Sequence, residues 1–78
     1  MAARSISVLV RNRPGALAGI SGIFAGLGCN IDRMRVGAGS HPDLSKIRIA
    51  ADVDDGILGV VLAQIRSRAD VLQVSVGR

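Results

Sequence analysis

The stretch SISVLVRNRPGALAGISGIFAGLG, residues 5–28, decides the fold. Apolar and polar residues alternate over Ser5–Val10, which is typical of a β-strand with one buried face. The apolar spacing then changes to that of a helix, whose stripe consists of Leu17, Ile20, Phe24 and Leu27. Pro14 suits the first helical position, and Gly28 suits a left-handed cap at the other end. We therefore predict a helix over Pro14–Leu27.

Four further segments complete the pattern. Alternation predicts strands over Ile31–Ala38, Leu44–Ala51 and Val71–Val76. A second helix should begin at Asp54-Asp55, where acidic groups favour the positive end of the helix dipole. This order predicts an α+β, ferredoxin-like βαββαβ sandwich, with a four-stranded antiparallel sheet and two helices on one face. At 78 residues the chain should be a single domain, 1–78.

Each predicted strand is amphipathic, so one face should meet the helices while the other stays open. The residues expected on the helix-facing side of the later strands are Met34, Val36, Ala38, Ile47, Ile49, Ala51, Leu72, Val74 and Val76. The stripe expected to be buried on the second helix is Leu58, Val61, Leu62 and Ile65. The open face would carry Ser5, Ser7, Leu9, Arg33, Arg35, Lys46, Arg48, Gln73 and Ser75.

The composition argues against several classes of protein. The chain has one cysteine, Cys29, and one histidine, His41, in separate loops. These two residues do not supply the nucleophile, base and orienting group of an enzyme, so we expect no catalytic residue, no metal site and no cofactor. Cys29 is expected to be a small buried hydrophobe and His41 an exposed loop residue. With no membrane-spanning run and no signal peptide, a cytoplasmic protein is expected.

The net charge of +4 raises the alternative of nucleic-acid binding. RNA recognition on this fold relies on aromatic rings that stack on bases across the open sheet face. The only aromatic residue, Phe24, belongs to a helix. A solvated basic surface, which is also a candidate docking surface, is therefore the favoured interpretation.

The start of the first helix is a candidate ligand site. Amides near Gly15, Ala16 and Leu17 should lie unpaired at the positive end of the helix dipole, where a carboxylate binds well. Gly15 would let a ligand approach the backbone. The alternative is a helix start whose amides bind water, and spacing alone favours that alternative.

The outward face of the first helix carries no charge. Its members are Ala18, Gly19, Ser21, Gly22, Ala25 and Gly26. A solvated helix face normally carries Lys or Glu, so we predict a dimer contact, with a partly exposed small-residue face as the alternative. Asn30 follows the far end of the helix, roughly 20 Å from its start. One chain does not easily bring both ends to one small ligand, whereas two chains related by a two-fold axis could bring Asn30 near the helix start of a neighbour.

Several blocks of sequence resemble an ACT domain, the amino-acid-sensing module of metabolic enzymes. The blocks are Ser7–Leu17, Gly28–Asp32, His41–Ser45 and Asp70–Val74. The third block makes the chain similar to the N-terminal ACT domain of the small regulatory subunit of acetolactate (acetohydroxyacid) synthase.

The resemblance implies a non-catalytic regulatory subunit. Such a subunit binds valine or another branched-chain amino acid between two ACT domains and modulates the catalytic subunit in branched-chain amino acid biosynthesis. The effector-binding residues it implies are Asn12, Gly15, Ala16, Leu17, Asn30 and Ile31. The dimer interface expected with it involves Ala18, Gly22, Ala25 and Met34.

Two other functions stay open at this point. The chain could be a stand-alone ACT-domain sensor that regulates another enzyme or a transcription factor, or it could bind nucleic acid. The typical small subunit has a second domain, so a minimal small subunit, a stand-alone protein and a part of a longer chain are all compatible with the sequence.

Overall fold

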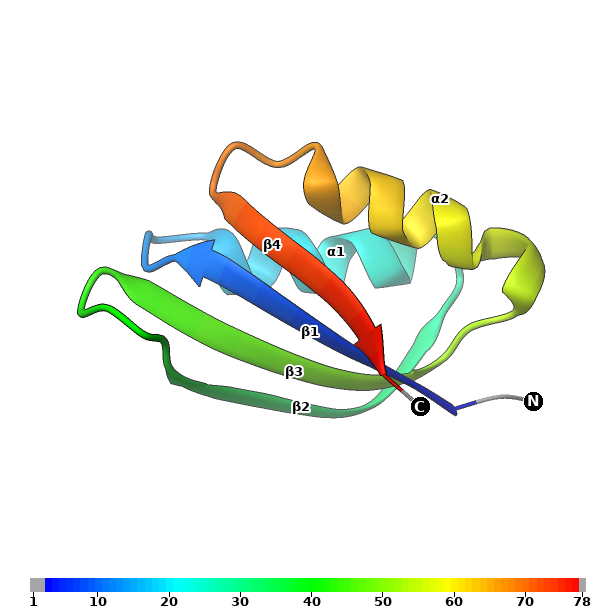
Figure 1. The fold of residues 1–78 in the computed structure, drawn as a ribbon. Helices are drawn as coiled ribbons and strands as arrows, with labels where there is room; N and C mark the ends of the chain where they lie inside the picture. The colour runs from blue at the N-terminus through cyan, green and yellow to red at the C-terminus, as the bar shows by residue number, and fades with distance from the viewer. Residues whose placement is uncertain (1–2, 78) are drawn as a thin grey trace.

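The computed structural model describes residues 3–77. The elements follow in the order β1 (Ala3–Arg11), α1 (Ala16–Gly26), β2 (Asn30–Ala38), β3 (Leu44–Asp52), α2 (Asp55–Arg66) and β4 (Val71–Gly77). The strands form one antiparallel sheet in the order β2-β3-β1-β4, and both helices cover the same face (Figure 1). The predicted βαββαβ sandwich is confirmed. Within residues 3–77, no helix has the length and hydropathy needed to cross a bilayer.

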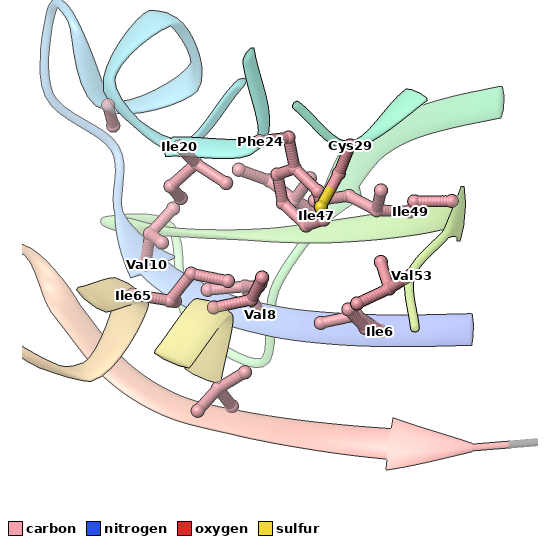
Figure 2. Close-up of a cluster of buried hydrophobic side chains, with 14 residues drawn as sticks. Ile6, Val8, Val10, Ile20, Phe24, Cys29, Ile47, Ile49, Val53 and Ile65 are labelled. Carbon is pink, nitrogen blue, oxygen red and sulfur yellow. The ribbon is translucent and has the colours of Figure 1, made fainter. Parts of the chain in front are cut away.

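The core lies between the two helices and one face of the sheet (Figure 2). On the central strand β1, Val8 lies opposite Ile47 of β3 and Val74 of β4, so the three side chains share the helix-facing side. Ile20 and Phe24 of α1 are fully buried against this layer. Because burying a side chain of this size contributes about 2–3 kcal/mol, these two residues anchor α1 on the sheet.

Helix α1 is shorter than predicted. It spans Ala16–Gly26, not Pro14–Leu27. Gly15, with φ 85°, occupies the position before the first helical residue in a left-handed conformation, which separates Pro14 from the helix. Pro14 therefore belongs to the turn that precedes the helix.

Gly28 ends α1 as predicted, with φ 72°. Its N–H donates to the carbonyl of Ala25 at 3.1 Å, and the N–H of Cys29 donates to the carbonyl of Phe24 at 2.9 Å. These two bonds form a Schellman motif, whose usual hydrophobic contact is supplied here by the buried Cys29 close to Phe24 (Figure 2). The expectation of a buried cysteine is confirmed.

Both edge strands contain a bulge. In β2, Ile31 pairs with Ala51 and Met34 with Ile49, so the register shifts around Asp32. In β4, Val71 pairs with Val10 and Val74 with Val8. Residues three apart in each edge strand therefore face the helices, which strict alternation did not predict.

Several expected buried positions of the edge strands are exposed. Val36 and Val76 are 53% and 39% exposed, and Ala38 is exposed as well. Val36 lies opposite the buried Ile47, so it is on the helix side of the sheet, but it lies beyond the cover that the helices give. Leu72 is 47% exposed because it falls within the bulge of β4. The prediction of a buried face was wrong at these four positions.

The second helix follows the prediction. Val61 and Ile65 are buried, while Leu58 and Leu62 are half-buried and pack on the core. The helix begins at Asp55, with Asp54 as the residue before it. Arg4 of β1 forms an ion pair with Asp55 and so ties the start of the helix to the sheet.

The left-handed cap can be tested by Gly28→Ala. A Cβ at positive φ costs about 1–2 kcal/mol, so we expect the free energy of unfolding to fall by that amount in urea titrations at fixed protein concentration. Gly59→Ala is the control, because this exposed glycine lies within α2 with open space around it. It should stabilise the protein by about 0.5–1 kcal/mol. Equal effects of the two substitutions would contradict the assigned role of Gly28.

Candidate functional site

The loop between β1 and α1 is fixed by backbone hydrogen bonds to distant segments. The N–H of Arg11 donates to the carbonyl of Asp70 at 2.8 Å, and the N–H of Asn12 donates to the carbonyl of Asp43 at 2.7 Å. The loop is therefore held between the start of β4 and the β2–β3 connection. This arrangement fixes where the backbone of Asn12 lies.

The amides at the start of α1 are not equivalent. The N–H of Ala16 donates to the carbonyl of Arg13 at 3.2 Å, so it is already engaged in a turn. Among the backbone hydrogen bonds of residues 3–77, none uses the N–H of Gly15 or Leu17. These two predicted donors are free of backbone partners, and they lie where the helix dipole favours an anion.

Asn12 also borders two shallow hollows beside the β2–β3 connection. One has a volume of about 640 Å³ and is lined by Asn12 together with residues of the connection, including His41 and Pro42. The other, of about 270 Å³, lies between residues 11–13 and Pro42-Asp43. His41 is exposed, as expected. The sequence did not predict that Pro42 lies beside Asn12, although both residues fall within the ACT-like blocks.

Asn30 and Ile31 lie beyond the opposite end of α1. The side-chain amide of Asn30 donates to the carboxylate of Asp32 at 2.9 Å, and Ile31 packs against the core. The eleven residues of α1 span about 16 Å at 1.5 Å per residue. One chain therefore does not bring Asn30 and Ile31 together with Asn12 and Gly15.

The outward face of α1 is exposed and carries no charge. Ala18, Gly22 and Ala25 are exposed, and Leu17 is 42% exposed. The neighbouring edge strand β2 contributes the half-buried Met34. Small and aliphatic residues thus continue from the helix to the edge of the sheet.

Gly19 does not belong to this outward face. A Cβ at Gly19 would collide with the guanidinium group of Arg68. Gly19 is half-buried, and its lack of a side chain makes room for that of Arg68, a residue just after the end of α2. The prediction that Gly19 lies on the outward face of the helix is therefore wrong.

Arg68 and Asp70 form a two-pronged ion pair beside α1. The guanidinium donates to both carboxylate oxygens, at 3.0 and 2.9 Å, and Asp70 is buried. These hydrogen bonds lower the pKa of Asp70 from its ordinary 3.8, although burial acts in the opposite direction. The same hydrogen bonds raise the pKa of Arg68. Because the carbonyl of Asp70 accepts the Arg11 N–H, the pair also supports the loop that carries Asn12.

Within residues 3–77, no group of three or more His, Cys, Asp or Glu side chains is placed to hold a metal ion.

The strand order β2-β3-β1-β4, with both helices on one face, is the ferredoxin-like arrangement that ACT domains adopt. The solved ACT domain of a GTP pyrophosphokinase from Chlorobium tepidum has the same fold, with a TM-score of 0.80 over 96% of both chains at 16% identity.

The chain belongs to the family of ACT domains like that of the acetohydroxyacid synthase small subunit, whose model matches residues 6–73. It is 37% identical to the probable acetolactate synthase small subunit of Archaeoglobus fulgidus over 91% of this chain and 45% of that protein. It is 36% identical to the isozyme 3 small subunit of Escherichia coli over 92% of this chain and 44% of that protein.

The solved acetolactate synthase small subunit from Thermotoga maritima superposes with a TM-score of 0.86 at 29% identity. The match covers 97% of this chain and 47% of that structure. This chain thus spans less than half the length of these three relatives. All three relatives are named as small subunits of acetolactate synthase.

The Arg68–Asp70 pair can be tested by pH. Because the folded pKa of Asp70 is lowered, its contribution to stability is present above the unfolded pKa and is lost as the pH falls through the folded pKa. Asp70→Asn should lower the free energy of unfolding at pH 7 by about 1–3 kcal/mol. It should also reduce the loss of stability that the wild type shows on acidification below about pH 4.

Urea titrations across this pH range measure both effects. The control is a double-mutant cycle with Arg68→Ala, which should show coupling of at least about 0.5 kcal/mol. The stabilising role of the pair would be contradicted if the two substitutions had additive effects. It would also be contradicted if Asp70→Asn lost as much stability at acidic pH as the wild type.

Proposed function

We propose that this chain is a regulatory domain of acetolactate synthase. It binds a branched-chain amino acid, valine or one similar, at the seam of a homodimer, and it thereby modulates the catalytic subunit. The observation that carries the proposal is the placement of the chain's polar groups at opposite ends of α1, in a chain whose relatives are named as small subunits of this enzyme.

The start of α1 has the chemistry to hold the carboxylate of an amino acid. The N–H groups of Gly15 and Leu17 have no backbone partner in the described residues, and the helix dipole is positive at this end. Apart from Gly15 and its two chain neighbours, no heavy atom of residues 3–77 lies within 4 Å of the place where a Cβ on Gly15 would stand. A ligand can therefore approach the backbone closely.

The remaining contacts come from both chains. Asn12 of one copy and Asn30 of the other supply side-chain amides for the ligand's polar groups. The half-buried Ile31, followed on the helix side of β2 by the half-buried Met34, offers an aliphatic surface. A branched aliphatic side chain suits such a surface, whereas a charged one would lose hydration without gaining a partner.

Two surfaces without a partner in the described part of one chain, the edge of β2 and the outward face of α1, support the proposed dimer. β2 is an edge strand, and an edge presents backbone donors and acceptors to any second strand. Antiparallel pairing of two β2 strands about a two-fold axis would bring together the charge-free α1 faces, with Ala18, Gly22, Ala25 and the neighbouring Met34 at the contact. Small residues allow two helices to approach closely.

Calorimetry with each of the twenty amino acids tests the effector site. We expect binding of valine or a related branched-chain amino acid, and a loss of at least about tenfold in affinity for Asn12→Ala and for Asn30→Ala, since each removes hydrogen bonds worth about 1.5 kcal/mol or more to a charged ligand. Gln64→Ala, on the exposed surface of α2, is the control and should bind as the wild type does.

A mixing experiment asks whether the site is shared. In a heterodimer of Asn12→Ala and Asn30→Ala chains, one site loses both asparagines and the other keeps both. After subunit exchange, about one quarter of the wild-type number of tight sites should return. No recovery would exclude the shared site. Binding of an unrelated amino acid would favour a sensor for another enzyme, and binding of none would refute an effector role.

Gly22→Glu tests the dimer. A carboxylate buried without a partner against a second helix costs several kcal/mol, so the dimer dissociation constant should rise by at least about 100-fold. Sedimentation velocity at micromolar concentration measures the change. Gln64→Glu adds the same charge on α2 and should leave the dimer intact. A Gly22→Glu protein that stays dimeric would rule out this interface.

A further inference from the structure

The face of the sheet that the helices leave open carries a cluster of cations. Arg33 and Arg35 of β2 and Lys46 and Arg48 of β3 are all exposed. The register places them on one face, because Arg35 pairs with Arg48 while the neighbouring Met34 pairs with the buried Ile49. We call these four residues the basic patch.

The charges of the basic patch are not balanced within the described part of the chain. The ion pairs found there are Arg4–Asp55, His41–Asp43 and Arg68–Asp70, and none of them includes a residue of the patch. Arg35 and Arg48 stand directly opposite one another across two strands. Like charges in this position destabilise a sheet, so the patch carries an energetic cost that an anionic partner would relieve.

Carboxylates close to the basic patch do not neutralise it. Asp52 pairs with Asn30 at the far end of β3, and Asp32 lies in the bulge of β2, where its carboxylate accepts the amide of Asn30. Between the ends of the strands, the open face continues over β1 and β4 with uncharged residues. Ser7 lies opposite both Arg48 and Ser75, and Leu9 lies opposite Lys46 and Gln73.

The geometry points to a protein surface as the partner. A shallow hollow of about 260 Å³ is lined by three arginines of the basic patch (Arg33, Arg35 and Arg48) with Ser5. Planar guanidinium groups bind carboxylates in a two-pronged manner. The chain's one aromatic ring, Phe24, is buried on the other side of the sheet, so the open face has no platform on which a nucleic-acid base could stack.

We propose that the basic patch is the docking surface for an acidic protein surface, that of the catalytic acetolactate synthase subunit. This inference rests on the function proposed above. In the proposed dimer the α1 faces and the β2 edges are occupied, while the open sheet face remains free. Pairing of two β2 strands would also place the two patches side by side. An effector at the seam, which lies on the helix side of β2, would then alter the angle between the two docking surfaces.

The test uses the whole chain and the purified catalytic acetolactate synthase subunit from the same genome, in biolayer interferometry at 50 and 300 mM salt. Arg35→Glu and Arg48→Glu should each weaken binding at least about tenfold, and high salt should weaken wild-type binding. Arg66→Glu is the matched control, because it changes the net charge equally from the exposed end of α2, in the layer across the sheet from the patch. It should change affinity less than about twofold.

A stability measurement separates docking from folding. Arg35→Glu replaces a like-charge pair across the strands with an opposite-charge pair, so its melting temperature should stay level or rise by about 1–4 °C. Loss of binding with unimpaired stability is the expected signature. Valine binding of the Arg48→Glu chain alone, measured by calorimetry, should be unchanged, because Arg48 lies on the interior strand β3.

Several results would overturn the proposal. If both arginine variants bind the catalytic subunit as the wild type does, or if Arg66→Glu weakens binding equally, docking does not use the basic patch, while the proposed function stands. If the wild-type chain does not bind the catalytic subunit, the proposed function and this inference fall together. If a labelled 20-nucleotide single-stranded RNA binds instead and depends on Arg35, the patch is a nucleic-acid surface.

Discussion

The packing of Ile20 and Phe24 against the sheet determines where both ends of α1 lie. Gly15 and Gly28, both in left-handed conformations, flank the helix and limit it to eleven residues. The free amides at its start and the asparagine beyond its end are consequently held about 16 Å apart. A ligand the size of an amino acid cannot bridge that distance in one chain. Core packing is thus the reason that the proposed effector site requires a second copy.

The central part of the fold was predictable because its signals are local. On β1 and β3, strict alternation correctly identified the buried side chains, since both strands have neighbours on each side and helices above them. The glycine cap at Gly28 was predictable because a left-handed residue at the end of a helical stripe has few alternatives. The edge strands β2 and β4 did not keep this alternation of buried and exposed residues. Spacings such as Ile31 to Met34 break the alternation at a bulge, and sequence alternation alone does not locate bulges.

The candidate site was predictable only in part, for a related reason. The positions of Gly15 and Asn12 follow from the strand-to-helix transition, which is a local pattern. The contact between the Asn12 backbone and Asp43, and the space that Gly19 leaves for Arg68, depend on segments far apart in the sequence. Gly19 therefore resembled the other small residues of α1, although its role is to accommodate a side chain from beyond α2.

The exposed edge of β2 also affects how readily the protein could aggregate. A chain without its partner presents an unpaired strand with the exposed Val36, which is the kind of edge that recruits further copies into fibrils. Arg33 and Arg35 alternate along this strand, and stacking many copies in register would align their charges at the spacing of adjacent strands. In the proposed pair of antiparallel copies only two such strands meet, so the repulsion does not grow with each added copy. The arginines of the edge strand thus act as gatekeepers, which oppose open-ended assembly while a closed pair remains accessible.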